Sequence, residues 1–268
     1  MIERWNIHPS IPIGLAVLCA AYILAAGPLR RRFPPGPPLD GLRAWTFGLG
    51  IAVFFLALTG PIHDLSDSYL FSVHMIQHLI ITLVAPPLIL MGTPDWMVRP
   101  LVARRGVWPV FRFLTRAPIA FVIPSLTLAI WHAPPLYSAT LMDLPTHIFE
   151  HLLFISTAFL MWWPVLSPMR EMRLKPAQQM LYLVLLTLPM KALGAALTMQ
   201  NDVLYPAYAL APRVYGISPM DDQKLGGLLM WLPSGSVLWG AAAIIFFRWW
   251  NADQRAQAPT THNRPEVV

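Results

Sequence analysis

The chain alternates long apolar segments with short segments that hold most of its charged residues. The apolar segments approach the roughly 20 residues that a helix needs to cross a bilayer. This pattern predicts an all-α, polytopic integral membrane protein with one seven-helix transmembrane domain over residues 1–250. The predicted transmembrane helices span residues 11–28, 43–60, 70–92, 117–134, 146–166, 178–200 and 225–247.

Composition supports a membrane bundle. Charged residue types make up 12% of the 268 residues, about half of the roughly 25% found in soluble domains. The polar residues 251–268 are predicted to form a disordered cytoplasmic tail. Prolines inside the spans, such as Pro86, Pro87 and Pro124, leave helix carbonyls that neighbouring helices must satisfy.

Lys and Arg residues concentrate in alternate loops and therefore predict an orientation. Of the 19 basic residues, 15 fall in the loops after spans one, three and five, or after span seven. Because cytoplasmic loops are enriched in Lys and Arg, we predict that the N-terminus lies outside and the C-terminus inside. The net charge of +6 is then a topology signal with a contribution from anionic lipid, and no nucleic-acid partner is expected.

Seven of the eight histidines fall at the predicted outer face. His74 and His78 are four residues apart, as are His147 and His151. This spacing places both imidazoles of a pair on one helix face. Since both pairs lie in the first turns of spans that enter from outside, we expect four imidazoles to converge near that interface. The remaining outer histidines are His8, His63 and His132.

This convergence predicts a metal site. Imidazole binds copper and zinc, thioethers favour Cu(I), and polar groups inside spans tend to be functional. Nearby carboxylates would raise the local cation concentration or orient imidazole N–H groups. We predict as ligands His74, His78, His132, His147, His151 and Met75, with His63, Asp64, Asp67, Glu150 and Asp222 as accessory residues.

Other interpretations use the same residues. Histidines in membrane helices hold haem in other proteins, and two pairs at one depth allow one haem but argue against two stacked haems. The segment HIFEH (147–151) matches the H-x-x-E-H metalloprotease pattern, but so short a match in a histidine-rich helix is weak. Lys191, inside the sixth span, is expected to snorkel outward, to pair with Glu150 or Asp222, or to neutralise an anionic ligand.

Four ordered blocks carry a resemblance to a known family. They are SVHMIQHLIITLVAPPLILMGTP (72–94), WHAPPLY (131–137), HIFEHLLF (147–154) with WWPV (162–165), and DQKLGGLLMWLP (222–233). They resemble the multi-span CtaG family of cytochrome c oxidase assembly factors, which is associated with caa3-type oxidases. The positions that match the family motifs include Gln77 and Gln223, which we add to the accessory residues.

The resemblance implies a function in maturing the oxidase. It implies a protein of the bacterial cytoplasmic membrane that delivers copper, expected as Cu(I), to the oxidase without catalysing a reaction. The expected partners are oxidase subunits, periplasmic copper chaperones and the lipid bilayer. A haem-handling or redox protein, a metal-free assembly scaffold and a copper-tolerance protein remain the alternatives.

Overall fold

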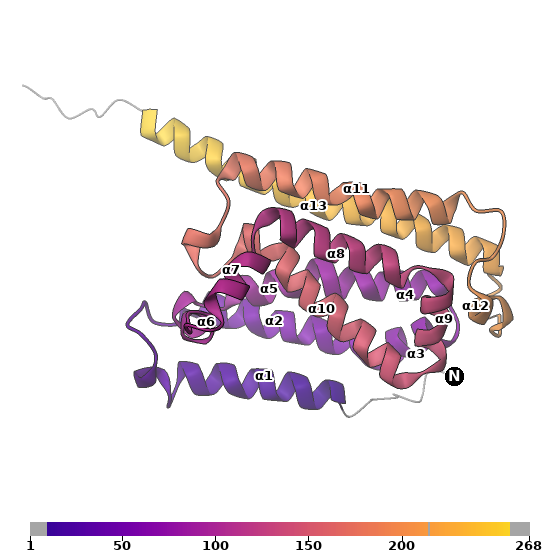
Figure 1. Ribbon diagram of the computed structural model, residues 1–268, viewed down its shortest axis with the longest axis horizontal. Coiled ribbons are helices and arrows are strands. Elements are labelled where there is room, and N and C mark those ends of the chain that lie inside the picture. The colour runs from indigo at the N-terminus through magenta and orange to yellow at the C-terminus, as the bar shows by residue number, and fades with distance from the viewer. Residues whose placement is uncertain (1–9, 214, 258–268) are drawn as a thin grey trace, which may run out of the picture.

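The computed structural model describes residues 10–213 and 215–257, and these residues form helices and no strands. The all-α prediction is therefore confirmed. The long helices lie along one axis of an elongated bundle (Figure 1). They are α1 (Ser10–Ala26), α2 (Gly41–Leu58), α4 (Phe71–Leu79), which continues through a π-helical turn (Ile80–Val84) into α5 (Ala85–Gly92), α8 (Ala117–Trp131), α10 (Leu144–Leu166), α11 (Pro176–Thr198) and α13 (Pro219–Gln257).

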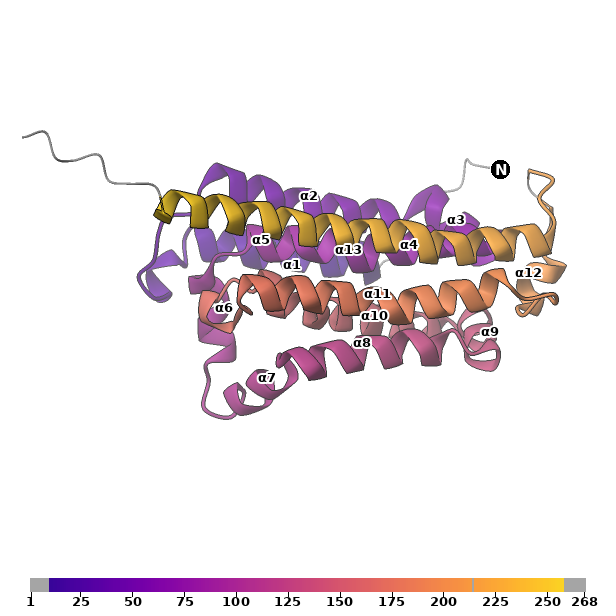
Figure 2. The same ribbon diagram turned by 90° about the horizontal axis from the view of Figure 1, so that it is seen from above.

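Short helices close the two ends of the bundle. At one end lie α3 (Gly60–Ser68), α9 (Pro134–Met142) and α12 (Pro206–Leu210), and at the other lie α6 (Asp95–Val102) and α7 (Trp108–Leu114) (Figures 1 and 2). The arginine-bearing connectors of the sequence lie at the α6 end. The two ends of the bundle therefore differ in charge, as the orientation prediction requires, although the orientation itself stays a prediction.

The described residues include five helical segments long and apolar enough to cross a membrane. A sixth is obtained if α7 and α8, which are bent by 71° relative to each other, count as one broken span. Helix α1 coincides with the first predicted span but is a shorter apolar helix. Each predicted span thus corresponds to an apolar helix, whereas the count of seven crossings stays a prediction.

The predicted disordered tail is partly wrong. Helix α13 continues to Gln257, and the amide of Gln257 donates to the Asp253 carboxylate at 2.7 Å, one turn earlier. Alanine, glutamine and arginine in this stretch are strong helix formers, so the helix of the last span does not stop where the apolar run stops. The rest of the predicted tail, residues 258–268, lies outside the described residues.

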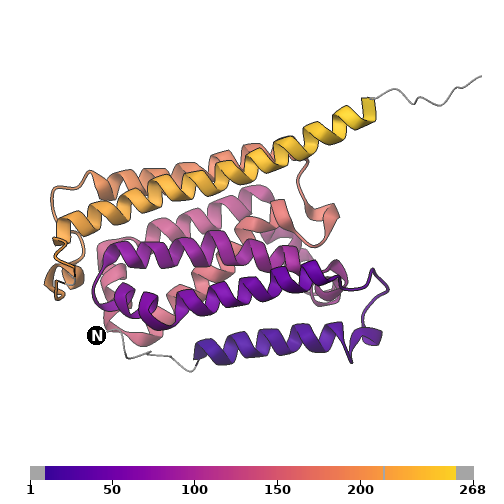
Figure 3. The ribbon, with the colours of Figure 1, turned by 180° about the vertical axis from the view of Figure 1, so that it is seen from behind.

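Helices α11 and α13 pack side by side along their lengths (Figures 1 and 2). A Cβ atom at Gly227 would lie 2.8 Å from the carbonyl oxygen of Gly194 and 2.5 Å from Oγ1 of Thr198. Such distances are too short for any side chain, so glycine is required at this crossing. Helix α1 lies along the opposite edge of the bundle from α13 (Figure 3).

Two prolines inside the spans, Pro86 and Pro124, leave helix carbonyls that donors on neighbouring helices reach, as predicted. Pro86 cannot donate to the carbonyl of Thr82, which instead accepts the indole N–H of Trp162 at 2.9 Å. Pro124 frees the carbonyl of Ala120 in the same way. The Tyr182 hydroxyl shares its proton between that carbonyl, at 3.1 Å, and the carbonyl of Met161, at 2.8 Å. Neighbouring helices therefore supply the missing donors.

Candidate metal centre

The candidate site lies where α3, α4 and α10 meet, at the α3 end of the bundle. Its imidazoles and the Glu150 carboxylate are buried. On each helix the residues lie one turn apart, which turns them toward the same neighbours. The contributing residues are His63 and Asp67 of α3, His74 and His78 of α4, and His147, Glu150 and His151 of α10.

These side chains form three overlapping groups. In each group the ligand atoms lie within 4.8 Å of one another, and the groups are His63–Asp67–His147, His147–Glu150–His151 and His74–His78–Glu150. His147 is shared by the first two groups and Glu150 by the last two. Exposure falls from 23% for the Asp67 side chain to 0% for that of Glu150. The groups therefore form one continuous series that leads inward from α3.

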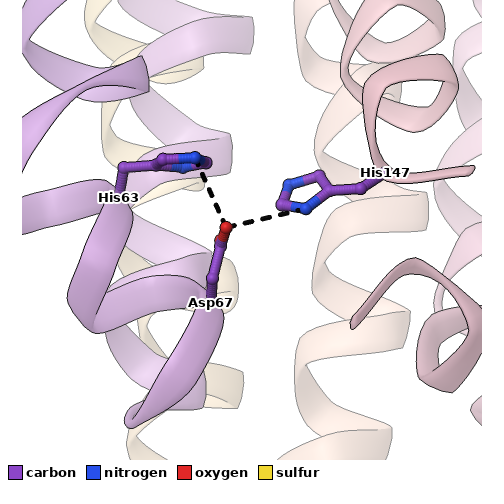
Figure 4. A group of neighbouring side chains, drawn as sticks. All are labelled: His63, Asp67 and His147. Carbon is purple, nitrogen blue, oxygen red and sulfur yellow. Dashed lines mark ion pairs between the residues drawn. The ribbon is translucent and has the colours of Figure 1, made fainter. Parts of the chain in front are cut away.

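Asp67 joins two imidazoles in the outermost group (Figure 4). Its Oδ2 lies 3.4 Å from Nε2 of His63 and 3.6 Å from Nδ1 of His147. These separations are longer than a direct hydrogen bond. Two ligands that bind one tetrahedral ion at about 2.0–2.1 Å lie about 3.3 Å apart. The spacing around Asp67 is thus close to that of a ligand set.

Burial raises the pKa of the Asp67 carboxyl to about 7, because desolvation penalises the charged form. The Ser66 hydroxyl donates to Oδ1 at 2.9 Å and lowers the pKa, whereas the charge of nearby Asp64 raises it. Asp64 is in none of the three groups and acts on the site through this charge. A cation bound beside Asp67 would offset the free-energy cost of burying the charged carboxylate.

Gln77 fixes the His63 ring. Its amide nitrogen donates to the Ala57 carbonyl at 2.8 Å and lies 3.1 Å from Nδ1 of His63. An amide N–H can only donate, so Nδ1 of His63 accepts, and the proton of the neutral ring is on Nε2, facing Asp67. In this arrangement Nε2–H of His63 points toward Asp67 and can orient its carboxylate, while the accessory role of His63 stays a prediction.

Tyr208 fixes the His74 ring in the opposite tautomer. The Tyr208 hydroxyl donates to the Ser66 carbonyl at 2.6 Å and lies 3.3 Å from Nδ1 of His74. Because its single proton is used, the hydroxyl oxygen can only accept from Nδ1–H of His74. Nε2 of His74 therefore keeps its lone pair, and it has no hydrogen-bond partner among the described residues. This is the tautomer that a metal ligand needs.

Glu150 lies at the centre of the series, shared by two of the groups. Among the described residues neither carboxylate oxygen has a partner at hydrogen-bond distance, although the Thr140 hydroxyl, which donates to the Tyr137 carbonyl, lies close to the carboxyl. Nε2 of His78 lies 3.8 Å from Oε1. Both ring nitrogens of His78 and Nε2 of His151 also lack partners in the described part of the chain. Buried polar atoms of this kind are costly, and a cation would satisfy the carboxylate and one nitrogen of each neighbouring ring.

Two predicted ligands lie apart from the carboxylates. His132, at the end of α8, is in none of the three groups, and its ring centre is 6.2 Å from that of His78. Met75 lies on the side of α4 that faces α13, where it packs with Phe71 and Met230 in an apolar cluster. Helix packing separates these two residues from the carboxylate groups, although all lie at a similar depth.

Two predicted accessory residues stabilise the backbone around the site. Asp222 of α13 accepts the backbone N–H groups of Phe71 at 2.7 Å and Ser72 at 3.1 Å, and so caps α4. Gln223 accepts the N–H of Leu204 at 2.7 Å and donates to the Asp202 carbonyl at 3.1 Å. Their link to the site is indirect, through the position of α4 and of the loop that leads to Tyr208.

Lys191 lies away from the predicted acidic partners. Its side chain crosses Gly235 of α13, where an added Cβ would be 3.3 Å from Cε of Lys191. The ion pairs within the described residues join Lys191 to neither Glu150 nor Asp222. The prediction of such a pair is therefore wrong, because Lys191 packs against α13. His8, the other outer histidine of the sequence, lies outside the described residues.

A hollow of about 480 Å³ borders the outer groups between α1, α2 and α10. Its wall is apolar except where His63, His147 and His151 face it. The outer groups can thus be reached from the side of the bundle as well as from its end.

Sequence reasoning missed several residues of the site. Tyr208 comes from α12, the short helix between α11 and α13, and has no spacing relation to the histidines. Tyr137, which is hydrogen-bonded to Tyr208 at 3.1 Å, lies in the WHAPPLY block, six residues after Trp131. That block was the one available signal, since it placed an aromatic hydroxyl close in sequence to His132.

Known proteins similar to this chain indicate its family. The sequence model of a family described as cytochrome c oxidase caa3 assembly factor (Caa3_CtaG) matches residues 20–252. An uncharacterized protein of Mycobacterium bovis and one of Mycobacterium tuberculosis are each 27% identical over 248 residues, which cover 86% of this chain and 37% of the relative. The chain therefore spans little more than a third of the length of these relatives. No solved structure matches the chain.

Proposed function

This chain belongs to the family of cytochrome c oxidase caa3 assembly factors, and on that premise we propose that it binds copper at the groups around Asp67 and Glu150 and passes the metal to the oxidase. The family supplies the link to the oxidase. The copper is argued from the chemistry of the side chains.

Glu150 is the observation that carries the proposal. A carboxylate buried without a partner costs several kcal/mol. Glu150 is fully buried beside Nε2 of His74, both ring nitrogens of His78 and Nε2 of His151, which also have no hydrogen-bond partner in the described residues. A copper ion would balance the carboxylate charge and use the bare nitrogens at the same time. The four imidazoles grouped with Glu150 favour copper or zinc over magnesium or calcium, which prefer oxygen ligands.

The overlap of the groups suits transfer better than storage. A metal held by Asp67 and His147 in the outermost group can move to the next group while it keeps His147, and then onward while it keeps Glu150. Each step exchanges part of the ligand set, so the ion is never stripped of all its ligands. The partly exposed Asp67 is the entry or exit that a copper carrier or an oxidase subunit would reach.

The remaining assignments follow from this picture. Helices long and apolar enough to cross a membrane support a location in the bilayer, and we assign the protein to the bacterial cytoplasmic membrane, which fits a factor of this family. We place the groups on the extracytoplasmic side, where the basic loops are absent. Movement of an ion makes and breaks only coordination bonds, so we assign no catalytic residue.

Metal analysis and an absorbance spectrum of the detergent-purified protein test the proposal. Wild-type protein, purified after growth with added copper, is compared with Glu150→Gln and with His74→Ala/His78→Ala. Glu171→Gln is the matched control, because Glu171 is an exposed carboxylate outside the groups. We expect near-stoichiometric copper in wild type and control, and a loss of at least half of it in both site variants.

Each alternative gives a different result. A Soret band in the wild-type spectrum would show haem and overturn the copper assignment. Protein that stays metal-free after anaerobic loading with Cu(I) would leave a metal-free scaffold for the oxidase. Copper that is bound normally, with unchanged oxidase copper in cells that lack the protein and a raised sensitivity to copper, would indicate tolerance instead of delivery.

A further inference from the structure

A second cavity lies deeper in the bundle, on the far side of His78 from the carboxylates. Its volume is about 50 Å³, enough for a few water-sized spheres or for one ion. Helices α4, α8, α10, α11 and α13 all contribute to its wall. Four of the chain's 13 methionines are among the 16 lining residues, one from each of four helices. These are Met75 of α4, Met161 of α10, Met190 of α11 and Met230 of α13.

His132 presents a bare nitrogen at this cavity. Its Nδ1 lies 2.8 Å from the Leu128 carbonyl, which can only accept, so Nδ1 carries the ring proton. Nε2 is left with its lone pair, is buried, and has no hydrogen-bond partner within the described residues. The Tyr205 hydroxyl donates to the His132 carbonyl at 3.0 Å and fixes the end of α8. A histidine whose Nδ1–H is held by a carbonyl is arranged as a metal ligand.

His78 connects the cavity with the carboxylate groups. It belongs to the His74–His78–Glu150 group and also lines the cavity. Its ring centre lies 5.9 Å from that of His151 and 6.2 Å from that of His132. Since both nitrogens of His78 lack partners among the described residues, a rotation of this ring can present a ligand to either side.

The cavity differs in chemistry from the carboxylate groups. No Asp or Glu is among its lining residues, and the hydroxyls of Thr82, Ser125 and Thr157 are bonded to carbonyls of their own helices. Its available ligands are two imidazoles and four thioethers. Thioethers select soft ions such as Cu(I). A single positive charge is also cheaper to bury without a carboxylate than a double charge.

One face of α10 runs from the carboxylate groups to the cavity. His147, His151, Phe154, Ala158 and Met161 recur at helical spacing, and all five are buried. From His147 to Met161 this face runs over 14 residue steps, or about 21 Å at helical rise. The ligand types change along it from carboxylate and imidazole to thioether.

We propose that this cavity is a second metal site, selective for a soft monovalent ion, formed by His78, His132 and the thioethers of Met75, Met161, Met190 and Met230. It receives Cu(I) from the carboxylate groups through His78. The inference rests on the proposed function only for the route by which copper reaches the cavity, and the ligand chemistry stands independently of it.

X-ray absorption of the full-length protein in detergent, loaded anaerobically with Cu(I), tests the site. Ag(I), a redox-inert ion of similar softness, is titrated in parallel. The variant Met161→Leu/Met190→Leu/Met230→Leu removes three thioethers at nearly constant volume, so the core should still pack. Its matched control, Met91→Leu/Met142→Leu/Met199→Leu, changes three exposed methionines outside the cavity.

We expect sulfur neighbours around copper in wild type and in the control, and their loss in the cavity variant. Ag(I) affinity should fall at least tenfold in the cavity variant alone. Copper with only nitrogen and oxygen neighbours in wild type, or equal Ag(I) affinity in both triple variants, would overturn the second site.

The Glu150→Gln variant separates this inference from the proposed function. If Glu150→Gln loses no copper and its copper still has sulfur neighbours, the cavity is supported as a metal site. The same result would overturn the carboxylate groups as the binding site. If Glu150→Gln loses copper and wild-type copper has no sulfur neighbours, the carboxylate groups are supported as the binding site. The proposal of a second site in the cavity would then be wrong.

Discussion

The hydroxyl of Tyr208 lies 3.3 Å from Nδ1 of His74, and this contact determines which nitrogen of the imidazole is available. Tyr208 reaches His74 from α12, the short helix between α11 and α13, and lies 134 positions after it in the chain. A segment that is remote in sequence therefore leaves the lone pair of His74 on Nε2, the tautomer that the proposed metal site requires. Contacts of this kind are as important to a metal site as the ligands themselves.

We predict that Tyr208→Phe weakens copper binding without removing a ligand. Loss of the hydroxyl frees the His74 ring to adopt the other tautomer, and outer contacts of this kind are worth about 10–100-fold in affinity. Competition with a Cu(I) chelator measures the effect. Tyr215→Phe, at an exposed tyrosine, is the control. Equal affinities for the two variants would contradict the role given to Tyr208.

Asp222 is predicted to affect stability instead of metal content. Asp222→Ala leaves the N–H groups of Phe71 and Ser72 buried without an acceptor, at a cost of about 1–3 kcal/mol. Thermal unfolding in detergent should show a lower Tm, while folded protein keeps its copper stoichiometry. A variant with wild-type Tm and reduced copper would instead make Asp222 part of the metal site.

The crossing of α11 and α13 gives a matched pair of glycine substitutions. Gly227→Ala places a methyl group 2.8 Å from the Gly194 carbonyl oxygen, so the helices must separate and the protein should lose stability. Gly240→Ala, on the same helix, meets nothing within 4 Å. It should be neutral or stabilise the helix by up to about 1 kcal/mol. Denaturant unfolding of both variants measures the difference, and equal stabilities would contradict the packing.

The raised pKa of Asp67 predicts a pH-dependent stability of the metal-free protein. Its carboxyl titrates near 3.8 when unfolded and at about 7 when folded. The folded state therefore holds an extra proton between these values, and stability falls as the pH rises through this window. Asp67→Asn removes the charge, so it should raise the Tm at pH 8 more than at pH 5. Equal shifts at both pH values, measured with a metal chelator present, would contradict the buried carboxyl.

The sequence predicted the local geometry of the site because that geometry depends on one helix at a time. The spacing of His74 and His78, or of His147 and His151, fixes which residues share a helix face. The length of the apolar runs fixes how far each residue lies from the end of its helix. These two quantities placed the imidazoles at one end of the bundle before any contact between helices was known.

The sequence could not predict how the helices are rotated about their own axes. That rotation separates Met75 and His132 from the carboxylates and brings Met161, Met190 and Met230 together, although these three have no common spacing. It also decides that Asp222 caps α4 and that Lys191 packs against Gly235.

The sequence by itself thus determined an all-helical membrane bundle, its apolar segments and a collection of histidines at one end. Only the tertiary structure decided which of these side chains meet, which tautomer each ring adopts and where the methionines gather. The physical reason is that helix propensity and hydropathy act over neighbouring residues. Helix rotation and loop contacts instead depend on close packing between remote segments, as at Gly194 and Gly227.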